Sequence, residues 1–308
     1  MIRMYTDNDL DGLGCAIALR VLRPDDKLKI TYCGSKRKIS DMVSEELNKI
    51  TESDLMIITD IPINEKTANK VEEAIVYDNK RILLFDHHST QMWCNKYPWA
   101  CVETEIRGRE YCAMSLLVEY LYFKTKPEIL NSLVYQRLLE IAEYVRLWDT
   151  WNWQKTDYLV PKYLNYLIDI LGKSAFIDYV VDYITMKRDV LITDENMVII
   201  NYLLKKFNDT VSFKNMNLIK MEKYGYKFGV TTAESNISEL GNALCKINPD
   251  LDFIAIVNQT TVSYRSIKKD IDVSKIAKEL GGGGREQTAA NPIAPKLIKN
   301  YYKEIFKI

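Results

Sequence analysis

Short, continuous apolar runs set the strongest constraint on how this chain can fold. Residues 55–59 (LMIIT) and 82–85 (ILLF) have the composition of strands that are buried on both faces of a parallel sheet. Residues 2–6 and 29–33 are two further β-prone runs, and residues 64–77 have the spacing of a helix. Strands that alternate with helices in this way predict a doubly wound α/β domain.

Three of the predicted strands are followed directly by an aspartate. Asp7, Asp60 and Asp86 each stand at the carboxyl end of a strand. Open parallel sheets place their ligand sites at that edge. We therefore expect these three carboxylates to lie close together. For Asp60, which precedes Ile61-Pro62, the alternative is a simple turn.

The only two histidines of the chain, His87 and His88, follow Asp86. Carboxylate oxygens combined with imidazole suit manganese or magnesium better than a closed tetrahedral zinc site. The alternative is structural: one histidine caps a helix or pairs with a carboxylate. Two adjacent histidines at a strand end favour the metal interpretation.

Residues 7–12 (DNDLDG) form an acidic segment that resembles the start of a calcium-binding EF-hand loop. That loop needs a glutamate at its twelfth position, where this chain has Ala18. A dinucleotide-binding motif also fails, because Ile17 stands where its third glycine would be. A solvated acidic turn remains the alternative to a metal site.

Asp149 lies in the segment WDTWNW, beyond predicted helices at 112–124 and 128–147. Aromatic packing is the alternative reading of this segment. Together, the acidic motifs and the histidine pair can build two metal sites about 3.5–4 Å apart, an arrangement that binds a phosphoryl group and activates water. The residues of this set are Asp7, Asp9, Asp11, Asp60, Asp86, His87, His88 and Asp149.

Length and composition indicate two domains without a strong overall charge. The chain has 308 residues, with 42 basic and 42 acidic side chains, so local groups must attract any anionic substrate. No apolar run approaches the ~20 residues that span a bilayer, and the acidic start argues against a secretory signal. The six cysteines show no metal-binding spacing. A cytoplasmic protein without disulfide or membrane partners is expected.

The predicted organisation has three parts. Residues 1–190 form the parallel α/β domain, 191–214 a helical linker, and 215–308 a smaller α/β domain. In residues 215–308, predicted strands and helices lie on both sides of the four glycines at 281–284. Its strands are expected at 226–231, 253–257 and 261–264, and its helices at 236–246, 273–280 and 292–306.

The motifs, in this order, resemble the DHH phosphoesterase superfamily, which is named after the triplet seen here as Asp86-His87-His88. Residues 7–12 are similar to the first motif of RecJ-type exonucleases, and to the nano-RNase B version that has His in place of Asp7. Asp60 matches the second motif and Asp149 the fourth. Residues 263–266 (SYRS) and 281–284 (GGGG) match the companion substrate-binding domain.

The resemblance implies a parallel-sheet DHH catalytic domain and a role for each acidic motif. Asp86, His87 and His88 would be catalytic, with Asp86 and His88 binding metal directly or orienting the ligands. Asp60 would bridge two manganese ions, with magnesium as the alternative. The implied metal ligands are Asp7, Asp9, Asp11, Asp60, His87 and Asp149.

The glycine motif departs from the family pattern. The family has His after the four glycines and Gly at the end of the motif, where this chain has Arg285 and Ala290. The glycine amides could approach a phosphate at the start of a following helix, and Arg285 could bind it bidentately. The alternative is that the glycines only end a helix. The implied substrate-binding residues are Arg265, Ser266, Gly282, Gly283, Gly284 and Arg285.

The resemblance implies metal-dependent hydrolysis of short oligonucleotides to nucleoside 5′-monophosphates. The absence of a long basic stripe favours a short single-stranded oligonucleotide or a small nucleotide as partner. Three other functions stay open: hydrolysis of cyclic dinucleotides or 3′-phosphoadenosine 5′-phosphate, non-catalytic nucleotide binding, and pyrophosphate hydrolysis. A homodimer is compatible with the sequence. For Trp148, Trp151 and Trp153 core packing is expected, with base stacking as the alternative.

Overall fold

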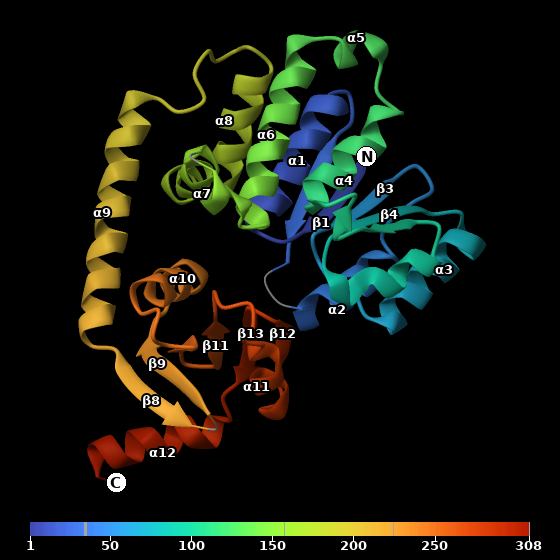
Figure 1. The fold of residues 1–308 in the computed structure, drawn as a ribbon. Coiled ribbons are helices and arrows are strands. Elements are labelled where there is room, and N and C mark those ends of the chain that lie inside the picture. Colours follow the sequence, from blue (N-terminus) through green and yellow to red (C-terminus); the bar gives the residue numbers. More distant parts are fainter. Residues whose placement is uncertain (34–35, 157, 224, 308) are drawn as a thin grey trace. The chain divides into compact units, whose positions relative to one another are not determined.

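The computed structural model describes residues 1–33, 36–156, 158–223 and 225–307. The chain divides into two compact units, Met1–Ile200 and Asn201–Ile308. The first unit contains a parallel sheet with helices on both faces, and the second contains a mixed sheet with its own helices (Figure 1). Both parts of the predicted α/β fold class are confirmed.

The first sheet has the strand order β2-β1-β3-β4-β5, and all neighbouring pairs are parallel. Its direction of growth reverses at β1, because β2 is added on one side and β3 on the other. Ligands of open α/β sheets bind at such a switch point, outside the carboxyl ends of the strands. The strands are β1 (Ile2–Thr6), β2 (Leu28–Tyr32), β3 (Leu55–Thr59), β4 (Arg81–Asp86) and β5 (Ala100–Val102).

Helices cover both faces of this sheet, which explains the continuous apolar runs in its inner strands β3 and β4. Met56 and Ile58 of β3 share a buried cluster with Val43 of α2 and Val71 of α3. On the other face, Phe85 of β4 contacts Tyr120 of α4, and α1 packs against α4 and α6. The bounds are α1 (Leu10–Leu22), α2 (Lys36–Glu46), α3 (Glu65–Asp78), α4 (Ala113–Tyr122) and α6 (Leu133–Asp149).

Shorter elements complete the first unit. A small hairpin, β6 (Glu105–Ile106) and β7 (Arg109–Glu110), precedes α4. The other elements are η1 (Ser89–Lys96), α5 (Pro127–Leu130), η2 (Asn152–Lys155), α7 (Val160–Leu171) and α8 (Lys173–Ile184). Helix α9 (Asp194–Met216) then crosses from the first unit into the second.

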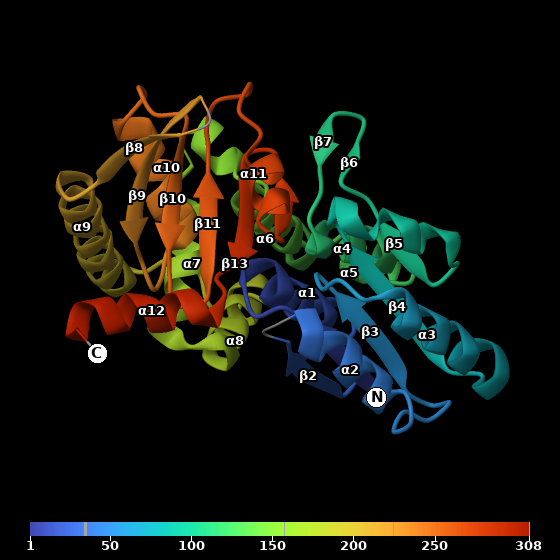
Figure 2. The same cartoon turned by 90° about the horizontal axis from the view of Figure 1, so that it is seen from below.

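The second sheet has the strand order β12-β13-β11-β10-β9-β8, and Figure 2 shows its strands side by side. The β9–β10 pair is parallel and the other pairs are antiparallel. Ile254 packs towards α10, and Phe253 packs towards α11. The bounds are β8 (Ile219–Lys223), β9 (Tyr226–Thr232), α10 (Ile237–Ile247), β10 (Phe253–Val257), β11 (Thr261–Arg265), α11 (Val273–Glu279), β12 (Gly283–Arg285), β13 (Thr288–Pro292) and α12 (Pro295–Phe306).

The four glycines do not lead directly into a helix, as the phosphate-binding interpretation expected. Instead, Gly283–Arg285 forms β12 and pairs with β13. Gly282 explains the geometry: a Cβ atom at this position would lie 2.1 Å from the carbonyl oxygen of Ala290. The glycines therefore allow β12 and β13 to approach closely. The interpretation of the glycines as a helix end did not predict this pairing. The last helix accordingly begins at Pro295 and not at residue 292.

Smaller differences concern where elements end. Asp86 is the last residue of β4 and Asp149 the last residue of α6, whereas each was expected just beyond its element. Helix α9 begins at Asp194 and ends at Met216, close to the linker expected at 191–214. The limits of the predicted domains, 1–190, 191–214 and 215–308, stay predictions.

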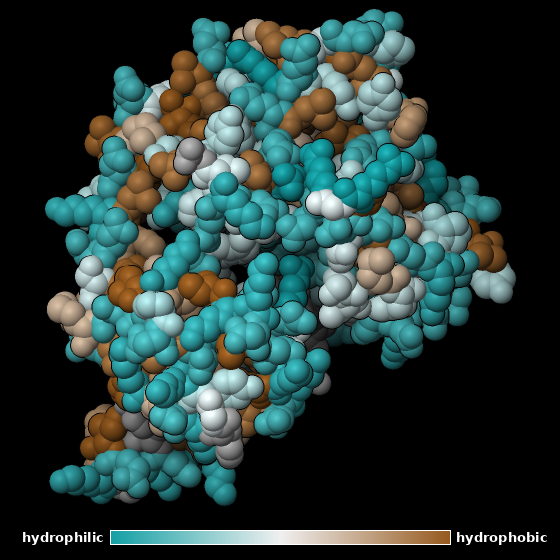
Figure 3. Space-filling view, viewed as in Figure 1, coloured by the Kyte–Doolittle hydropathy of each residue, from teal (hydrophilic) through white to brown (hydrophobic). Residues whose placement is uncertain are grey.

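Within the described residues, none of the helices combines the length and apolar composition that a membrane crossing requires. On the face shown in Figure 3, hydrophobic residues are scattered among hydrophilic ones. The six cysteines are present as free thiols.

Candidate metal centre

The turn that joins β1 to α1 carries the first acidic motif. Asp9 is the N-cap of α1, and its Oδ1 accepts a hydrogen bond from the backbone N of Gly12 at 3.1 Å. A Cβ atom at Gly12 would lie 2.3 Å from the carbonyl oxygen of Asp7, so glycine is required for this turn. Burial raises the pKa of the half-buried Asp7 carboxyl.

Asp11 points inward and caps a second helix. Its Oδ2 accepts a hydrogen bond from the backbone N of Ala113 at 2.7 Å, and its Oδ1 from that of Met114 at 2.8 Å. The side chain of Cys112, the N-cap of α4, makes no capping hydrogen bond, so Asp11 supplies the acceptors for this helix end. Burial, and then the charge of Asp149, raise the pKa of Asp11 to about 7.

Asp60 occupies the switch point after β3 in an unusual backbone conformation. Its φ angle is +54°, and its backbone N donates to the carbonyl of Phe85 at 3.0 Å. Only 3% of the residue is exposed. Burial raises the pKa of Asp60 well above its ordinary value, and the charges of Asp9 and Asp11 raise it further. A strained, buried carboxylate of this kind is typical of a functional site.

The Asp86-His87-His88 triplet is organised around one carboxylate oxygen. Oδ1 of Asp86 accepts hydrogen bonds from the backbone N of His87 at 2.8 Å and of His88 at 3.2 Å. The same oxygen lies 2.7 Å from Nδ1 of His88. Asp86 thus fixes both the local backbone and the orientation of the His88 ring.

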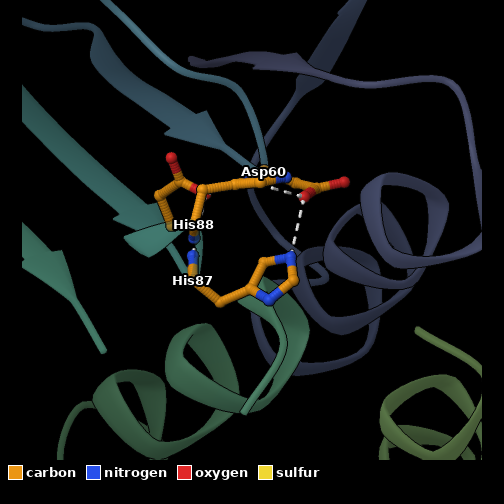
Figure 4. Close-up of side chains that lie close together, drawn as sticks. Asp60, His87 and His88 are labelled. Atoms are coloured by element: carbon orange, nitrogen blue, oxygen red, sulfur yellow. Dashed lines mark hydrogen bonds and ion pairs between the residues drawn. The ribbon is translucent and has the colours of Figure 1, made fainter. Parts of the chain in front are cut away.

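His87 joins three elements at the centre of the cluster. Its Nε2 lies 3.3 Å from Oδ2 of Asp149 and 3.5 Å from Oδ1 of Asp60. Figure 4 shows the His87 ring pointing towards the Asp60 carboxylate. The carboxyl ends of β3 and β4 and the end of α6 therefore converge on one imidazole.

Two overlapping sets of ligand atoms result, and each set lies within 4.8 Å. His87 belongs to both sets. One set consists of Asp60, Asp86, His87 and His88, and the other of Asp11, His87 and Asp149.

This donor set fits a divalent cation. Oδ2 of Asp60 and Oδ2 of Asp86 are buried and, within the described ranges, have no hydrogen-bond partner. Buried carboxylate oxygens normally gain hydrogen bonds or bind a cation, because uncompensated burial of their charge is costly. Several carboxylates around one imidazole meet this need through a cation and match the preference of manganese and magnesium for oxygen ligands.

The structure thus brings six of the eight predicted residues into the two sets. Asp7 and Asp9 lie outside them, at the same edge of the sheet. Asp9 is exposed, and its charge contributes to the raised pKa of Asp60 and Asp11. The ligand roles of all eight residues stay predictions.

The two predicted arginines of the second unit stand in one cross-strand row. Arg265 of β11 and Arg285 of β12 both pair with Thr288 of β13. Directly opposed residues in antiparallel strands project from the same face. The guanidinium of Arg265 donates to Ser238 Oγ at 2.8 Å, whereas Arg285 is exposed.

The other predicted substrate-binding residues differ in their surroundings. Ser266 is buried, and its Oγ donates to the carbonyl of Asp252 at 2.7 Å. Gly282 and Gly284 lie against the backbone of β13, while a Cβ atom at Gly283 would meet nothing within 4 Å. Local contacts therefore explain Ser266, Gly282 and Gly284 without a substrate, and leave Gly283 open for one.

Sequence reasoning missed the partners that hold the predicted residues in place. Ala113 and Met114 act through backbone N–H groups, and Ser238 positions Arg265. Main-chain donors leave no mark in side-chain composition. A usable signal for Asp11 was the lack of a good capping residue before the helix at 113, where Cys112 stands.

Comparison with known proteins finds a relative that matches this chain along its whole length. The chain is 32% identical over 314 residues to the curated oligoribonuclease NrnB of Bacillus subtilis (strain 168). The match covers 100% of this chain and 77% of the relative. No model of a known protein family matches the chain.

Solved structures with the same fold include a manganese-bound exonuclease RecJ, with a TM-score of 0.58 and 13% identity. That match covers 98% of this chain and 88% of RecJ. A pGpG-specific phosphodiesterase, PggH from Vibrio cholerae, has a TM-score of 0.55 and 16% identity, and the match covers 100% of this chain and 98% of PggH. At these identities the likeness concerns the fold.

Proposed function

Because this chain belongs to the oligoribonuclease NrnB family of DHH phosphoesterases, we propose that it is a divalent-metal-dependent phosphodiesterase for short oligonucleotides. Its products would be nucleoside 5′-monophosphates. The observation that carries the proposal is the sharing of His87 between two buried sets of carboxylate ligands at the switch point of the sheet. Such a centre suits an anionic phosphodiester in a protein without a net positive charge.

Two ions, manganese or magnesium, are proposed for this centre. Bound divalent cations supply positive charge for the phosphoryl oxygens and lower the pKa of water. Asp60 is proposed to bridge them, because its Oδ1 lies 3.5 Å from Nε2 of His87 and 4.0 Å from Nδ1 of His88, and its carboxyl is close enough to Asp9 and Asp11 for their charges to raise its pKa. The proposed ligands are Asp7, Asp9, Asp11, Asp60, His87 and Asp149.

The remaining residues of the triplet have a positioning role in this proposal. Asp86 holds the backbone of His87 and the ring of His88 through one oxygen, so the imidazoles keep a fixed direction and His88 a fixed tautomer. The hydrogen bond from the backbone N of Asp60 to the carbonyl of Phe85 does the same for the Asp60 carboxylate. A preorganised site of this kind needs little rearrangement when the substrate binds.

The arginine row of the second unit is the proposed phosphate-binding surface. Arg285 is exposed and can form bidentate hydrogen bonds with a phosphate. Arg285→Ala should raise KM for a dinucleotide about tenfold or more and leave kcat nearly unchanged, since a charge-assisted hydrogen bond contributes about 1.5–3 kcal/mol. An unchanged KM on every nucleotide would exclude this role.

A substrate panel with purified protein tests the activity. With Mn²⁺ we expect a dinucleotide to give 5′-monophosphates, and EDTA to stop the reaction. Asp60→Asn should lower kcat by at least about a hundredfold, the scale of losing a tightly positioned catalytic group. Asp41→Asn, which changes an exposed aspartate of α2, is the matched control. Equal rates in wild type and Asp60→Asn would reject the proposed centre.

The same panel separates the alternatives. It includes a cyclic dinucleotide, 3′-phosphoadenosine 5′-phosphate and pyrophosphate beside the dinucleotide. If kcat/KM is higher for one of these compounds than for the dinucleotide, that compound and not a short oligonucleotide represents the substrate class. Nucleotide binding without hydrolysis of any compound would favour a non-catalytic binding protein.

A further inference from the structure

Three tryptophans surround the end of α6, where the chain delivers Asp149 to the metal centre. The ring centroids of Trp148 and Trp151 lie 6.1 Å apart, and those of Trp148 and Trp153 lie 5.6 Å apart. The distance between Trp151 and Trp153 is 6.4 Å. A ring enclosed between two others would separate them by about twice the stacking distance. None of the three rings is therefore enclosed by the other two, and each keeps a face that the other two do not cover.

These rings are not core residues. All three are partly exposed, in contrast with the fully buried side chains that fill the sheet interfaces. Large aromatic rings are normally buried or used at interfaces, because they carry much apolar surface. Three of the five tryptophans of the chain thus share one partly exposed cluster. Simple core packing does not account for this position.

Two local features suggest that the cluster is held in place for a ligand. Trp151 has a φ angle of +60°, a conformation that is costly for a bulky residue and is typical of functional sites. The indole Nε1 of Trp153 is buried and has no hydrogen-bond partner within the described ranges. Buried indole N–H groups usually find a partner, so this donor is a second feature of the cluster that internal packing does not explain.

The cluster also lies next to the chemistry. Asp149 stands between Trp148 and Trp151 in the chain, and its Oδ2 is 3.3 Å from Nε2 of His87. The ammonium of Lys162 lies over the Trp153 ring, 5.6 Å from its centre, which places positive charge beside the cluster. The cluster therefore begins at the residue that directly precedes a member of the metal centre in the chain.

We propose that Trp148, Trp151 and Trp153 form a stacking platform that binds a nucleobase of the substrate beside the metal centre. Stacking on an aromatic face tolerates every base, so the platform would select nucleotides over base-free phosphoesters without selecting a sequence. The inference rests on the proposed phosphodiesterase function and identifies what that site recognises.

Paired substitutions test the platform. Trp153→Leu keeps an apolar side chain and loses the aromatic face, whereas Trp153→Phe keeps a smaller aromatic face. We expect Trp153→Leu to raise KM for a dinucleotide about tenfold, with kcat little changed and with recovery in Trp153→Phe. Trp93→Leu is the matched control, because Trp93 is also partly buried and packs against the hydrophobic cluster of β3 and β4.

A base-free substrate separates this inference from the proposed function. KM for a dinucleotide analogue in which both bases are removed should be the same in wild type and Trp153→Leu. If wild type and Trp153→Leu hydrolyse both the dinucleotide and the base-free analogue, and KM for each compound is the same in the two proteins, the platform is overturned. The proposed phosphodiesterase function would still hold. Hydrolysis of neither compound by the wild type would reject the phosphodiesterase itself.

Fluorescence gives a readout that does not depend on turnover. In the double variant Trp93→Phe/Trp99→Phe, the remaining tryptophans are those of the platform. A non-hydrolysable dinucleotide should quench this emission to saturation, and ribose 5-phosphate should not. This titration also decides the question if Trp153→Leu does not fold. Absence of quenching at saturating dinucleotide, with binding verified by calorimetry, would overturn the platform.

Discussion

The Nε2 atom of His87 lies 3.3 Å from Oδ2 of Asp149, although the two residues come from the ends of β4 and α6. Oδ1 of Asp60 is 3.5 Å from the same nitrogen. This proximity gathers carboxylates in a region that is shielded from water, where their mutual repulsion is strong. A divalent cation bound among these carboxylates would offset that repulsion.

A divalent cation should raise the stability of the folded chain. Binding to the folded state alone adds about 2.7 kcal/mol to the free energy of unfolding when the cation concentration is a hundred times its Kd. Thermal unfolding with EDTA and with increasing Mn²⁺ measures the effect as a shift in Tm. In Asp60→Asn the shift should be much smaller, while Asp41→Asn should keep it. An equal shift in all three proteins would place cation binding elsewhere.

Asp60 and Asp86 should have opposite effects on the stability of the metal-free protein. Asp86→Ala removes the acceptor of two backbone N–H groups and one ring nitrogen, and should lower the free energy of unfolding by about 2–4 kcal/mol. Asp60→Asn removes a buried carboxyl group whose pKa is raised by burial. The free energy of unfolding should therefore stay equal or increase.

Urea unfolding in the presence of EDTA compares these two variants with wild type. Asn also tolerates the positive φ angle at residue 60, so the backbone should not contribute to the difference. A loss of stability in Asp60→Asn comparable with that in Asp86→Ala would show that Asp60 supports the fold and does not strain it.

More of the metal centre than of the surrounding secondary structure could be predicted from the sequence. Strand ends at Asp60 and Asp86 were predictable, because short apolar runs mark buried parallel strands and their carboxyl ends share one edge. The capping of α4 by Asp11 could not be predicted, because the partners of Asp11 are backbone N–H groups that are distant in the chain. Strand β12 was missed because glycine has low β-propensity, and the close approach of Gly282 and Gly284 to the backbone of β13 explains the pairing.

Glu46 should make the first unit sensitive to acid. The hydrogen bond from Lys49 lowers the pKa of Glu46, and the hydrogen bond from the buried Tyr5 hydroxyl, at 2.9 Å, lowers it further. A folded-state pKa below the unfolded value of 4.5 gives stability that is present above that value. This stability is lost as the pH falls through the folded pKa.

Glu46→Gln should therefore cost about 0.5–1 kcal/mol at pH 7 and close to nothing at about pH 3, because the interaction is partly exposed to solvent. Urea unfolding at both pH values measures the difference. The neighbouring, exposed Glu45 provides the control substitution Glu45→Gln. A cost that is independent of pH would mean that packing, and not charge, makes Glu46 important.

Gly282 and Gly283 should separate the structural and functional parts of the glycine motif. A Cβ atom at Gly282 would lie 2.1 Å from the carbonyl oxygen of Ala290, which forces β12 and β13 apart. Gly282→Ala should lower the free energy of unfolding by about 1–3 kcal/mol, the usual cost of overpacking. Gly283→Ala meets nothing within 4 Å and should leave stability unchanged.

Activity then distinguishes the two glycines. If the amides of this strand contact the substrate phosphate, Gly283→Ala should raise KM for a dinucleotide while Tm stays at the wild-type value, because the added methyl group projects into the open space where a phosphate would lie. Normal KM together with normal Tm in Gly283→Ala would limit the motif to a structural role. The phosphate contact would then fall to the exposed Arg285, at the end of the same strand.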